Sequence, residues 1–194
     1  MLNKKNFYIN GKWVSPTEPR NHKVIDPSNE EPCAEISLGG KKDVDKAVAA
    51  AKRAFETWAF SKKEERLELL EKLYVIYKKR WAEMAQLITL EMGAPMKFST
   101  EMQAATGASH IKSFKNILKD FKFEKDLGEE KNNQKLLYEP KGVCALITPW
   151  NWPINQVNLK VIPALASGCT VILKPSEIAP LSSMLLAEMI DEAK

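Results

Sequence analysis

The sequence predicts an α/β fold in which helices flank a parallel sheet, and three observations in its last third support this. Residues 142–148 (GVCALIT) form a short apolar run without polar alternation, which is typical of a strand buried on both faces. Apolar residues then recur at helical spacing from Ile154 to Leu165, and Gly168 follows as a helix-ending residue. Residues 170–173 (TVIL) form a second strand of the buried type. Two strands joined by one helix lie parallel, with a right-handed crossover.

The N-terminal third predicts short strands and then a helix. Residues 7–14 (FYINGKWV) hold two apolar segments around an Asn-Gly pair, the strongest short-range signal for a β-hairpin. Residues 24–27 and 35–38 predict further short strands, which a Gly-Gly pair terminates. A helix follows, because apolar residues share one stripe and acidic residues favour its N-terminus. The stripe consists of Val44, Ala47, Val48, Ala51, Ala54, Phe55 and Trp58.

Two more helical segments follow. Ser61 and Glu64 form a capping box at the head of a run that extends to Glu91, where the residues MGAP stop it. Because a run of about thirty residues is long for a globular helix, we expect a break near Arg80. A third, weaker helix is predicted over residues 99–118. Its apolar stripe consists of Met102, Ala105, Phe114 and Ile117.

Residues 119–133 differ from the rest of the chain in composition. They are rich in charge, Gly and Asn, and Phe121 and Phe123 alternate with polar residues. This pattern is typical of a loop or of an exposed hairpin.

Composition excludes several classes of protein. The chain has 194 residues, 44% of them hydrophobic, which suffices for a sizeable core. Its net charge of +4 arises from lysines dispersed among glutamates, which favours a mixed solvated surface over a nucleic-acid patch. No apolar run approaches the roughly 18 residues of a membrane span, and the first ten residues are too polar for a signal peptide.

The cysteines do not predict a metal site or a disulfide framework. Cys33, Cys144 and Cys169 are odd in number and far apart, and only His22 and His110 are available beside them. Zinc-ligand spacing is therefore absent, and we expect a reduced, cytoplasmic protein without a metal.

The polar loops of the predicted strand–helix–strand unit mark the candidate site. Pro149 and Pro153 bracket residues 150–152 directly after the first strand, and residues 174–177 (KPSE) follow the second strand. Ligands of open parallel sheets bind outside the carboxyl ends of the strands, where both loops lie.

Three motifs in this region, ITPWNWP, PALASGC and LKPSE, occur in the order and at the separations of one family. The chain resembles the aldehyde dehydrogenase superfamily, whose members oxidise aldehydes with NAD or NADP. The resemblance extends from YINGKWV near the start to the C-terminal helix and covers less than half of a typical member.

The resemblance implies an incomplete Rossmann-like parallel sheet with flanking helices, which is the truncated N-terminal cofactor-binding domain of the family. Residues 1–118 and 141–194 would form this partial domain. Residues 119–140 would belong to the β-arm through which subunits pair, and the catalytic domain would be absent.

Asn151 is the first candidate for chemistry. An asparagine held between aromatic residues and prolines at a strand end can direct its amide N–H at an oxyanion that develops from a carbonyl. The alternative is a turn-forming asparagine, the common role of this residue type in loops. The resemblance favours the first interpretation, because Asn151 matches the family's oxyanion-hole asparagine.

Lys174 and Glu177 are candidates for binding a nucleotide. An ammonium and a carboxylate after a buried strand can hydrogen-bond ribose hydroxyls. The alternative is a surface ion pair, worth about 0–1 kcal/mol. The resemblance implies ribose binding and NAD as the cofactor, leaving NADP open, although no G-x-G-x-x-G motif is present. The family's other cofactor-binding positions match Ile147, Thr148, Pro149, Trp150, Asn151, Pro175 and Ser176.

The predicted helix carries a third candidate surface. Trp152, Asn155, Gln156 and Leu159 share one face at helical spacing. Core packing would explain Trp152 and Leu159, whereas the two amides fit a core poorly. The resemblance implies that this face lines the substrate tunnel. Pro163 lies inside the helix, where we expect a kink.

Two hypotheses follow for function. In the first, the chain is the N-terminal part of an enzyme that oxidises a small-molecule aldehyde to a carboxylic acid through a thiohemiacetal, and that assembles as a homo-oligomer, a dimer or tetramer. The family's nucleophilic cysteine and general-base glutamate lie in motifs C-terminal to this chain, so the chain alone would be inactive. In the second, the short chain is a catalytically inactive module that binds a nucleotide or pairs subunits.

Overall fold

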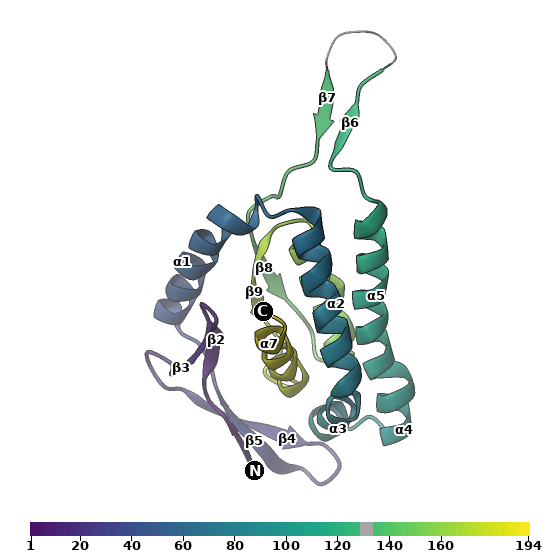
Figure 1. The fold of residues 1–194 in the computed structure, drawn as a ribbon. Coiled ribbons are helices and arrows are strands. Elements are labelled where there is room, and N and C mark those ends of the chain that lie inside the picture. Colours follow the sequence, from purple (N-terminus) through teal and green to yellow (C-terminus); the bar gives the residue numbers. More distant parts are fainter. Residues whose placement is uncertain (129–133) are drawn as a thin grey trace.

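The computed structural model describes residues 1–128 and 134–194. The N-terminal strands lie along one side of the molecule (Figure 1). Strands β2 (Phe7–Ile9) and β3 (Lys12–Val14) form the predicted antiparallel hairpin. Asn10 and Gly11 have φ values of 55° and 69°, as a type I′ turn requires. A second sheet has the order β1-β5-β4, and its strands are β1 (Leu2–Lys4), β4 (Asn21–Asp26) and β5 (Glu31–Ser37).

Helix α1 (Lys41–Trp58) forms as predicted but buries a different face. Its buried residues are Asp43, Ala50 and Ala51, whereas Val44 is 52% exposed. Asp43 lies inside because its carboxylate accepts hydrogen bonds from the Gly40 N–H (3.0 Å) and from the Thr17 N–H (2.8 Å) and hydroxyl (2.6 Å). The predicted stripe was therefore wrong at the N-terminal end of the helix.

The long helical run divides where expected, into α2 (Lys63–Lys79) and α3 (Trp81–Met92). The predicted capping box was displaced by one residue, because the Lys62 N–H donates to the Glu65 carboxylate at 3.3 Å. Ser61 instead donates to the Trp58 carbonyl (2.6 Å) and accepts a hydrogen bond from Arg66 Nε (2.8 Å).

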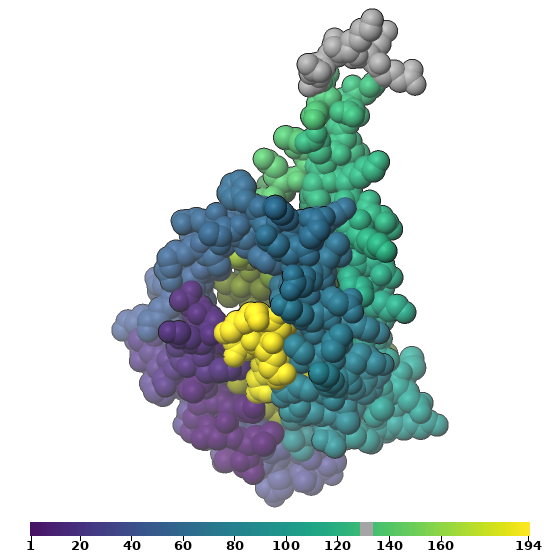
Figure 2. Space-filling model, in the orientation of Figure 1, coloured from purple at the N-terminus to yellow at the C-terminus, as the bar shows by residue number. Residues whose placement is uncertain are grey.

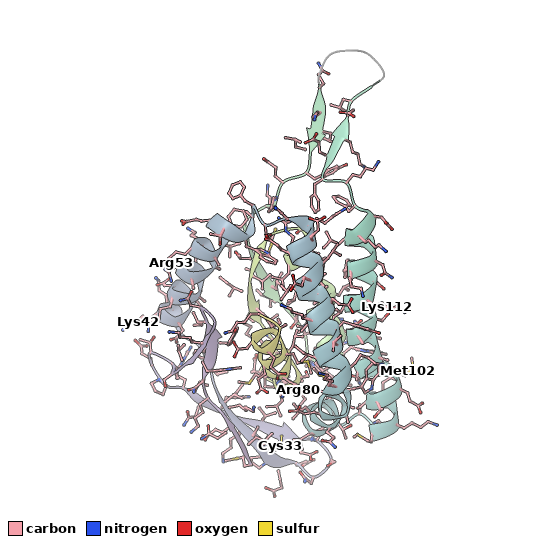
Figure 3. All side chains as sticks on the ribbon, in the orientation of Figure 1. Cys33, Lys42, Arg53, Arg80, Met102 and Lys112 are labelled. Atoms are coloured by element: carbon pink, nitrogen blue, oxygen red, sulfur yellow. The ribbon has the colours of Figure 1, made fainter. Side chains whose placement is uncertain are left out.

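The third helical segment contains a π-helical turn and buries an unexpected face. After α4 (Met96–Phe98), the turn η1 (Ser99–Gln103) leads into α5 (Ala104–Asp120). The predicted stripe was wrong here, because Met102 is 48% and Ile117 57% exposed, and Met102 lies on the outer side of the segment (Figure 3). The buried residues of α5 are Ala104, Gly107, Ala108, Ile111 and Leu118.

Small residues explain this choice of face. Tyr77 on α2 donates its hydroxyl hydrogen to the Ala104 carbonyl at 2.9 Å, and it crosses α5 at Gly107. A Cβ atom at Gly107 would lie 2.3 Å from the Tyr77 oxygen and 3.0 Å from Ile154 Cγ1. The close approach of α5 to its neighbours thus depends on a position without a side chain.

Residues after α5 form a hairpin that stands clear of the body (Figures 1 and 2). Strands β6 (Glu124–Asp126) and β7 (Lys135–Leu137) pair antiparallel. The exposed-hairpin interpretation of this region is therefore confirmed for the described residues. Part of the predicted segment, residues 129–133, lies outside them.

The C-terminal third contains the predicted unit of strand, helix and parallel strand. Strands β8 (Val143–Ile147) and β9 (Thr170–Lys174) pair in parallel, and α6 (Pro153–Ala166) connects them and continues through Pro163. Gly168 follows α6 with a φ of 87°, and a Cβ atom there would lie 2.5 Å from Arg66 Nη2.

One expectation for β8 was wrong. Its residues Ala145 and Ile147 are exposed, Ile147 by 73%, so the strand is not buried on both faces. Within the described residues β9 is the only strand paired with β8, and this face of the pair remains uncovered.

Helix α7 (Leu181–Ala193) closes the main core between α2, α3 and α6. The fully buried side chains of this core include Leu70, Tyr77, Ile111, Ile154 and Met189. Buried Glu91 on α3 accepts hydrogen bonds from the backbone N–H groups of Leu181 and Ser182, which begin α7. No helix in the described residues is both long and apolar enough to cross a membrane.

Candidate functional site

The two polar loops lie side by side at the carboxyl edge of the β8–β9 pair, as the sequence predicted. Ile147 and Lys174, the last residues of the two strands, are partners in the ladder. The Thr148 N–H donates to the Lys174 carbonyl at 3.2 Å, which extends the pairing by one residue. The chain segments that follow, residues 149–152 and 175–177, therefore leave the sheet at one place.

Lys174 and Glu177 form an ion pair in the second loop. Nζ and Oε2 are 2.6 Å apart, and the two side chains are 62% and 44% exposed. The Lys174 ammonium holds the pKa of Glu177 below its ordinary value, so the carboxylate is charged. The Ser176 hydroxyl accepts a hydrogen bond from the Ile178 N–H at 3.3 Å, which shapes the loop. An exposed cation and anion are thus available to a polar ligand at the strand ends.

Exposed apolar side chains surround this ion pair. Ile147 is 73%, Ile178 53% and Trp150 46% exposed. Large apolar side chains gathered beside charged groups are typical of ligand sites, in which apolar surface supplies affinity and polar groups supply orientation. This edge can therefore receive a ligand that combines a flat apolar part with hydroxyl groups.

Asn151 lies two residues before the start of α6 and is exposed. Within the described part of the chain, no hydrogen bond occupies its side-chain amide. Trp152 is the N-cap residue of α6 and Pro153 its first residue, where proline's fixed φ suits the helix start. The backbone around Asn151 is thus set by its neighbours, while the amide remains available to donate to an external oxygen.

The third predicted surface lies on α6 and contacts α5. Trp152 Nε1 donates to Thr106 Oγ1 at 3.1 Å, and the Asn155 Oδ1 atom lies 2.8 Å from His110 Nε2. Lys160 Nζ donates to Gln156 Oε1 at 3.3 Å. Leu159 is 44% exposed, so core packing does not explain it.

Sequence reasoning missed the residues of α5 and α4 that complete this surface. Thr106 and His110 lie one turn apart on α5, and Phe98 contacts Trp152 edge to face with centroids 5.5 Å apart. A pair of polar residues at i and i+4 in a helix that packs against the core was the available signal. Asn158 was also missed, and it donates to the Gly107 carbonyl at 2.9 Å from a fully buried position.

The cysteines lie away from the strand-end loops. Cys33 is in β5, and Figure 3 places it in the N-terminal sheet. Cys144 is in β8, and burial raises the pKa of both thiols.

Cys169 differs, because hydrogen bonds from the Ser167 hydroxyl and the Gly142 and Lys141 N–H groups outweigh its burial and lower its pKa. It precedes β9 at the opposite edge of the sheet, about 15 Å along the strand from Lys174. None of these thiols can reach the site. The described residues also contain no cluster of His, Cys, Asp or Glu side chains suited to a metal ion.

The fold is that of an α/β protein with a parallel βαβ unit, and the candidate ligand site lies at the carboxyl edge of that unit. Residues 13–194 match the model of the aldehyde dehydrogenase family. The chain belongs to this family.

Curated relatives and solved structures agree with this assignment. A 3-succinoylsemialdehyde-pyridine dehydrogenase from a Pseudomonas species is 48% identical over 193 residues, which are 99% of this chain and 40% of that relative. An aldehyde dehydrogenase structure from Bartonella henselae has 56% identity and a TM-score of 0.97 over 100% of this chain and 40% of its own.

A further solved structure contains ligands. Aldehyde dehydrogenase C from Pseudomonas syringae, in complex with NAD+ and octanal, is 41% identical with a TM-score of 0.94, over 98% of this chain and 38% of its own. The chain thus spans about two fifths of the length of the relatives that it matches.

Proposed function

We propose that this chain is the N-terminal part of an NAD-dependent aldehyde dehydrogenase, which oxidises an aldehyde to a carboxylic acid through a thiohemiacetal. The observation that carries the proposal is the position of Asn151. Asn151 is exposed, no hydrogen bond engages its amide within the described residues, and it lies at the same sheet edge as the Lys174–Glu177 pair. A candidate oxyanion donor and a candidate ribose site thus share one edge of the sheet, where NAD held by its adenosine end could extend its nicotinamide toward the substrate carbonyl.

The residues at the strand ends fit NAD. Glu177 is charged and exposed, so it can accept hydrogen bonds from ribose hydroxyls, and Lys174 can donate to them. Ile147 and Trp150 supply exposed apolar surface for the adenosine. The backbone of the loops supports these contacts through Thr148, Pro149, Pro175 and Ser176. When bound, NAD would accept the hydride.

Asn151 would act on the substrate. As the aldehyde carbonyl is attacked, its oxygen gains negative charge, and a donor positioned for that charge stabilises the transition state more than the ground state. The attacking thiolate and the base that activates water would come from the family's C-terminal motifs, because the cysteines described above lie away from this edge. The length of the relatives supports such a C-terminal region.

The face formed by Trp152, Asn155, Gln156 and Leu159 would line the substrate path. It begins one residue after Asn151, so a substrate whose carbonyl meets the Asn151 amide would extend along it. The Pseudomonas relative is named for an aldehyde that carries a pyridine, and the P. syringae structure contains octanal, which supports an aldehyde as the substrate class.

The projecting hairpin would pair subunits. We propose residues 119–140 as the oligomerisation segment of a dimer or tetramer and residues 1–118 and 141–194 as the partial cofactor-binding domain. Leu127 and Leu137 on the hairpin are 52% and 57% exposed, as expected for side chains that a second subunit would cover.

The test uses the complete protein that contains this chain. Purified protein, NAD and a panel of aldehydes are followed by the absorbance of NADH, with Asn151→Ala as the variant and Lys112→Ala, an exposed position on α5 (Figure 3), as the control. We expect turnover that Asn151→Ala reduces and Lys112→Ala preserves. The absence of NAD-dependent oxidation with every aldehyde would refute the proposal and leave an inactive nucleotide-binding or subunit-pairing module.

A further inference from the structure

Hydrogen bonds between α5 and α6 fix the orientation of the side chains on the proposed substrate face. Trp152 Nε1 donates to Thr106 Oγ1 (3.1 Å), and the Thr106 hydroxyl donates to the Gln103 carbonyl (2.8 Å). This chain of two bonds holds the indole ring in one position. Phe98 contacts the same ring edge to face, with centroids 5.5 Å apart. An aromatic wall is therefore preformed beside Asn151.

The amide of Asn155 is oriented in the same way. Its Oδ1 atom accepts a hydrogen bond from His110 Nε2 at 2.8 Å, and the imidazole stacks on Phe114 with an interplanar angle of 30°. Because the oxygen is occupied, the Nδ2 hydrogens point away from His110. Within the described residues no acceptor meets them.

Gln156 repeats this arrangement on the neighbouring position. Its Oε1 atom accepts from Lys160 Nζ at 3.3 Å, and the same ammonium lies 3.2 Å from the Gln156 carbonyl oxygen. The face therefore offers amide N–H donors and a positive charge, whereas its amide oxygens are engaged. A site with this polarity discriminates in favour of ligands that accept hydrogen bonds, because a buried donor left unpaired is costly.

We propose that this face selects aldehydes that carry a planar ring with a hydrogen-bond acceptor, with Asn155 as the specificity-determining residue. The inference rests on the proposed function, and it names the substrate class of the same site. The planar ring packs on the wall of Trp152 and Phe98. The acceptor, such as a ring nitrogen or a carbonyl oxygen, receives the Asn155 Nδ2 hydrogen. His110 is a positioning residue, since it acts by keeping the Asn155 oxygen occupied.

The experiment compares two aldehydes of equal shape in the complete protein. Pyridine-3-carbaldehyde has a ring nitrogen where benzaldehyde has a C–H group, so the ratio of their kcat/KM values reports on that acceptor. Dividing the ratio measured for a variant by the ratio measured for the wild type cancels the difference in intrinsic reactivity between the two aldehydes. Asn155→Leu removes the donor at similar volume, and the ratio should fall by about two- to tenfold, the worth of one neutral hydrogen bond.

Two further variants make the result specific. Asn155→Asp keeps the size of the side chain and replaces its donors by acceptors, so the ratio should fall at least as far. If Asn155→Leu does not fold, Asn155→Asp tests the proposal in its place. His110→Phe frees the Asn155 oxygen and lets the amide turn, so the ratio should fall partway. Lys112→Ala, on the exposed side of α5, should leave the ratio unchanged.

The outcomes separate this inference from the proposed function. Oxidation of both aldehydes with a ratio unchanged in both Asn155 variants would overturn the inference and leave the proposed function standing. A preference of the wild-type protein for hexanal over both aromatic aldehydes would also overturn it. If no aldehyde is oxidised, both proposals fall together.

Discussion

Glu91 provides a test of how the C-terminal helix is anchored. Its side chain is 1% exposed, and its carboxylate accepts hydrogen bonds from the N–H groups of Leu181 and Ser182, the latter at 3.1 Å. Burial raises the pKa of Glu91 to about 7, and the hydrogen bonds from Ser182 and Leu181 offset only part of this effect. The group therefore gains a proton on folding near neutral pH.

The sign and size of the effect on stability follow from this pKa. The ordinary value is 4.5, and a rise to about 7 corresponds to about 3 kcal/mol. Between these two pH values the native state binds more protons than the unfolded state, so the free energy of unfolding falls as pH rises. The stability that protonated Glu91 contributes is fully present below pH 4.5 and is lost above about pH 7.

The assay is urea unfolding of the chain at several pH values across this range, for the wild type and for Glu91→Gln. Glutamine has nearly the same shape and does not titrate, and the other carboxylates contribute equally to both proteins. The wild type should lose about 3 kcal/mol more than the variant as pH rises through this range. Glu101→Gln, at an exposed glutamate, serves as the control and should follow the wild type. Equal pH dependence of wild type and Glu91→Gln would refute the reasoning.

Further substitutions test the site and the helix packing. Asn151→Ala in the complete enzyme should lower kcat by roughly 10²–10³ with little change in the KM for NAD, measured by steady-state kinetics, and lost NAD affinity at unchanged kcat would instead make Asn151 a cofactor or turn residue. Glu177→Gln should raise kcat/KM for NADP relative to NAD, because the carboxylate repels a 2′-phosphate, and an unchanged ratio would place Glu177 outside the ribose site. Gly107→Ala should destabilise the protein by about 1–3 kcal/mol in thermal unfolding, since the new methyl group meets the Tyr77 hydroxyl, and a Tyr77→Phe background should reduce that cost. The chain by itself should oxidise no aldehyde with NAD, because the cysteines lie away from the site; turnover that Cys169→Ser abolishes would contradict this.

The sequence predicted the elements whose signals are local. An Asn-Gly pair between apolar segments sufficed for the hairpin β2–β3, and continuous apolar runs around one helix sufficed for the parallel pair β8 and β9. The positions of the strand-end loops followed from topology alone. These features depend on backbone chemistry and connectivity, which a single chain encodes without reference to its neighbours.

The choice of buried face could not be predicted in the same way. On α5 the apolar residues Met102 and Ile117 remain exposed, while Gly107 and Ala108 are buried. Hydrophobic periodicity favours large side chains, whereas the packing of α5 against Tyr77 and α6 requires small ones. That requirement comes from residues distant in the sequence.

The sequence likewise predicted some residues of the candidate site and missed others. Lys174, Glu177 and Asn151 could be located because they follow strand ends, but their partners on α5 could not. Thr106 and His110 contact Trp152 and Asn155 across 45 residues or more, and only the packed structure shows which amide atoms they occupy. The direction in which a side-chain amide donates is thus a property of tertiary structure.

The hairpin β6–β7 has a consequence for how this protein can evolve. Among the described residues it meets the body near its base, where Phe121 packs against Phe123 and Tyr138, and where Arg66 lies 5.5 Å from the centre of the Phe123 ring. Beyond that base its strand residues are exposed, so mutations there remove no core contact. Natural selection can therefore alter the sequence of the hairpin, and with it the proposed subunit contact, while the edge formed by β8 and β9 stays as it is. Under the proposed role of the hairpin, the pairing of subunits can thus change at little cost to the stability of the body.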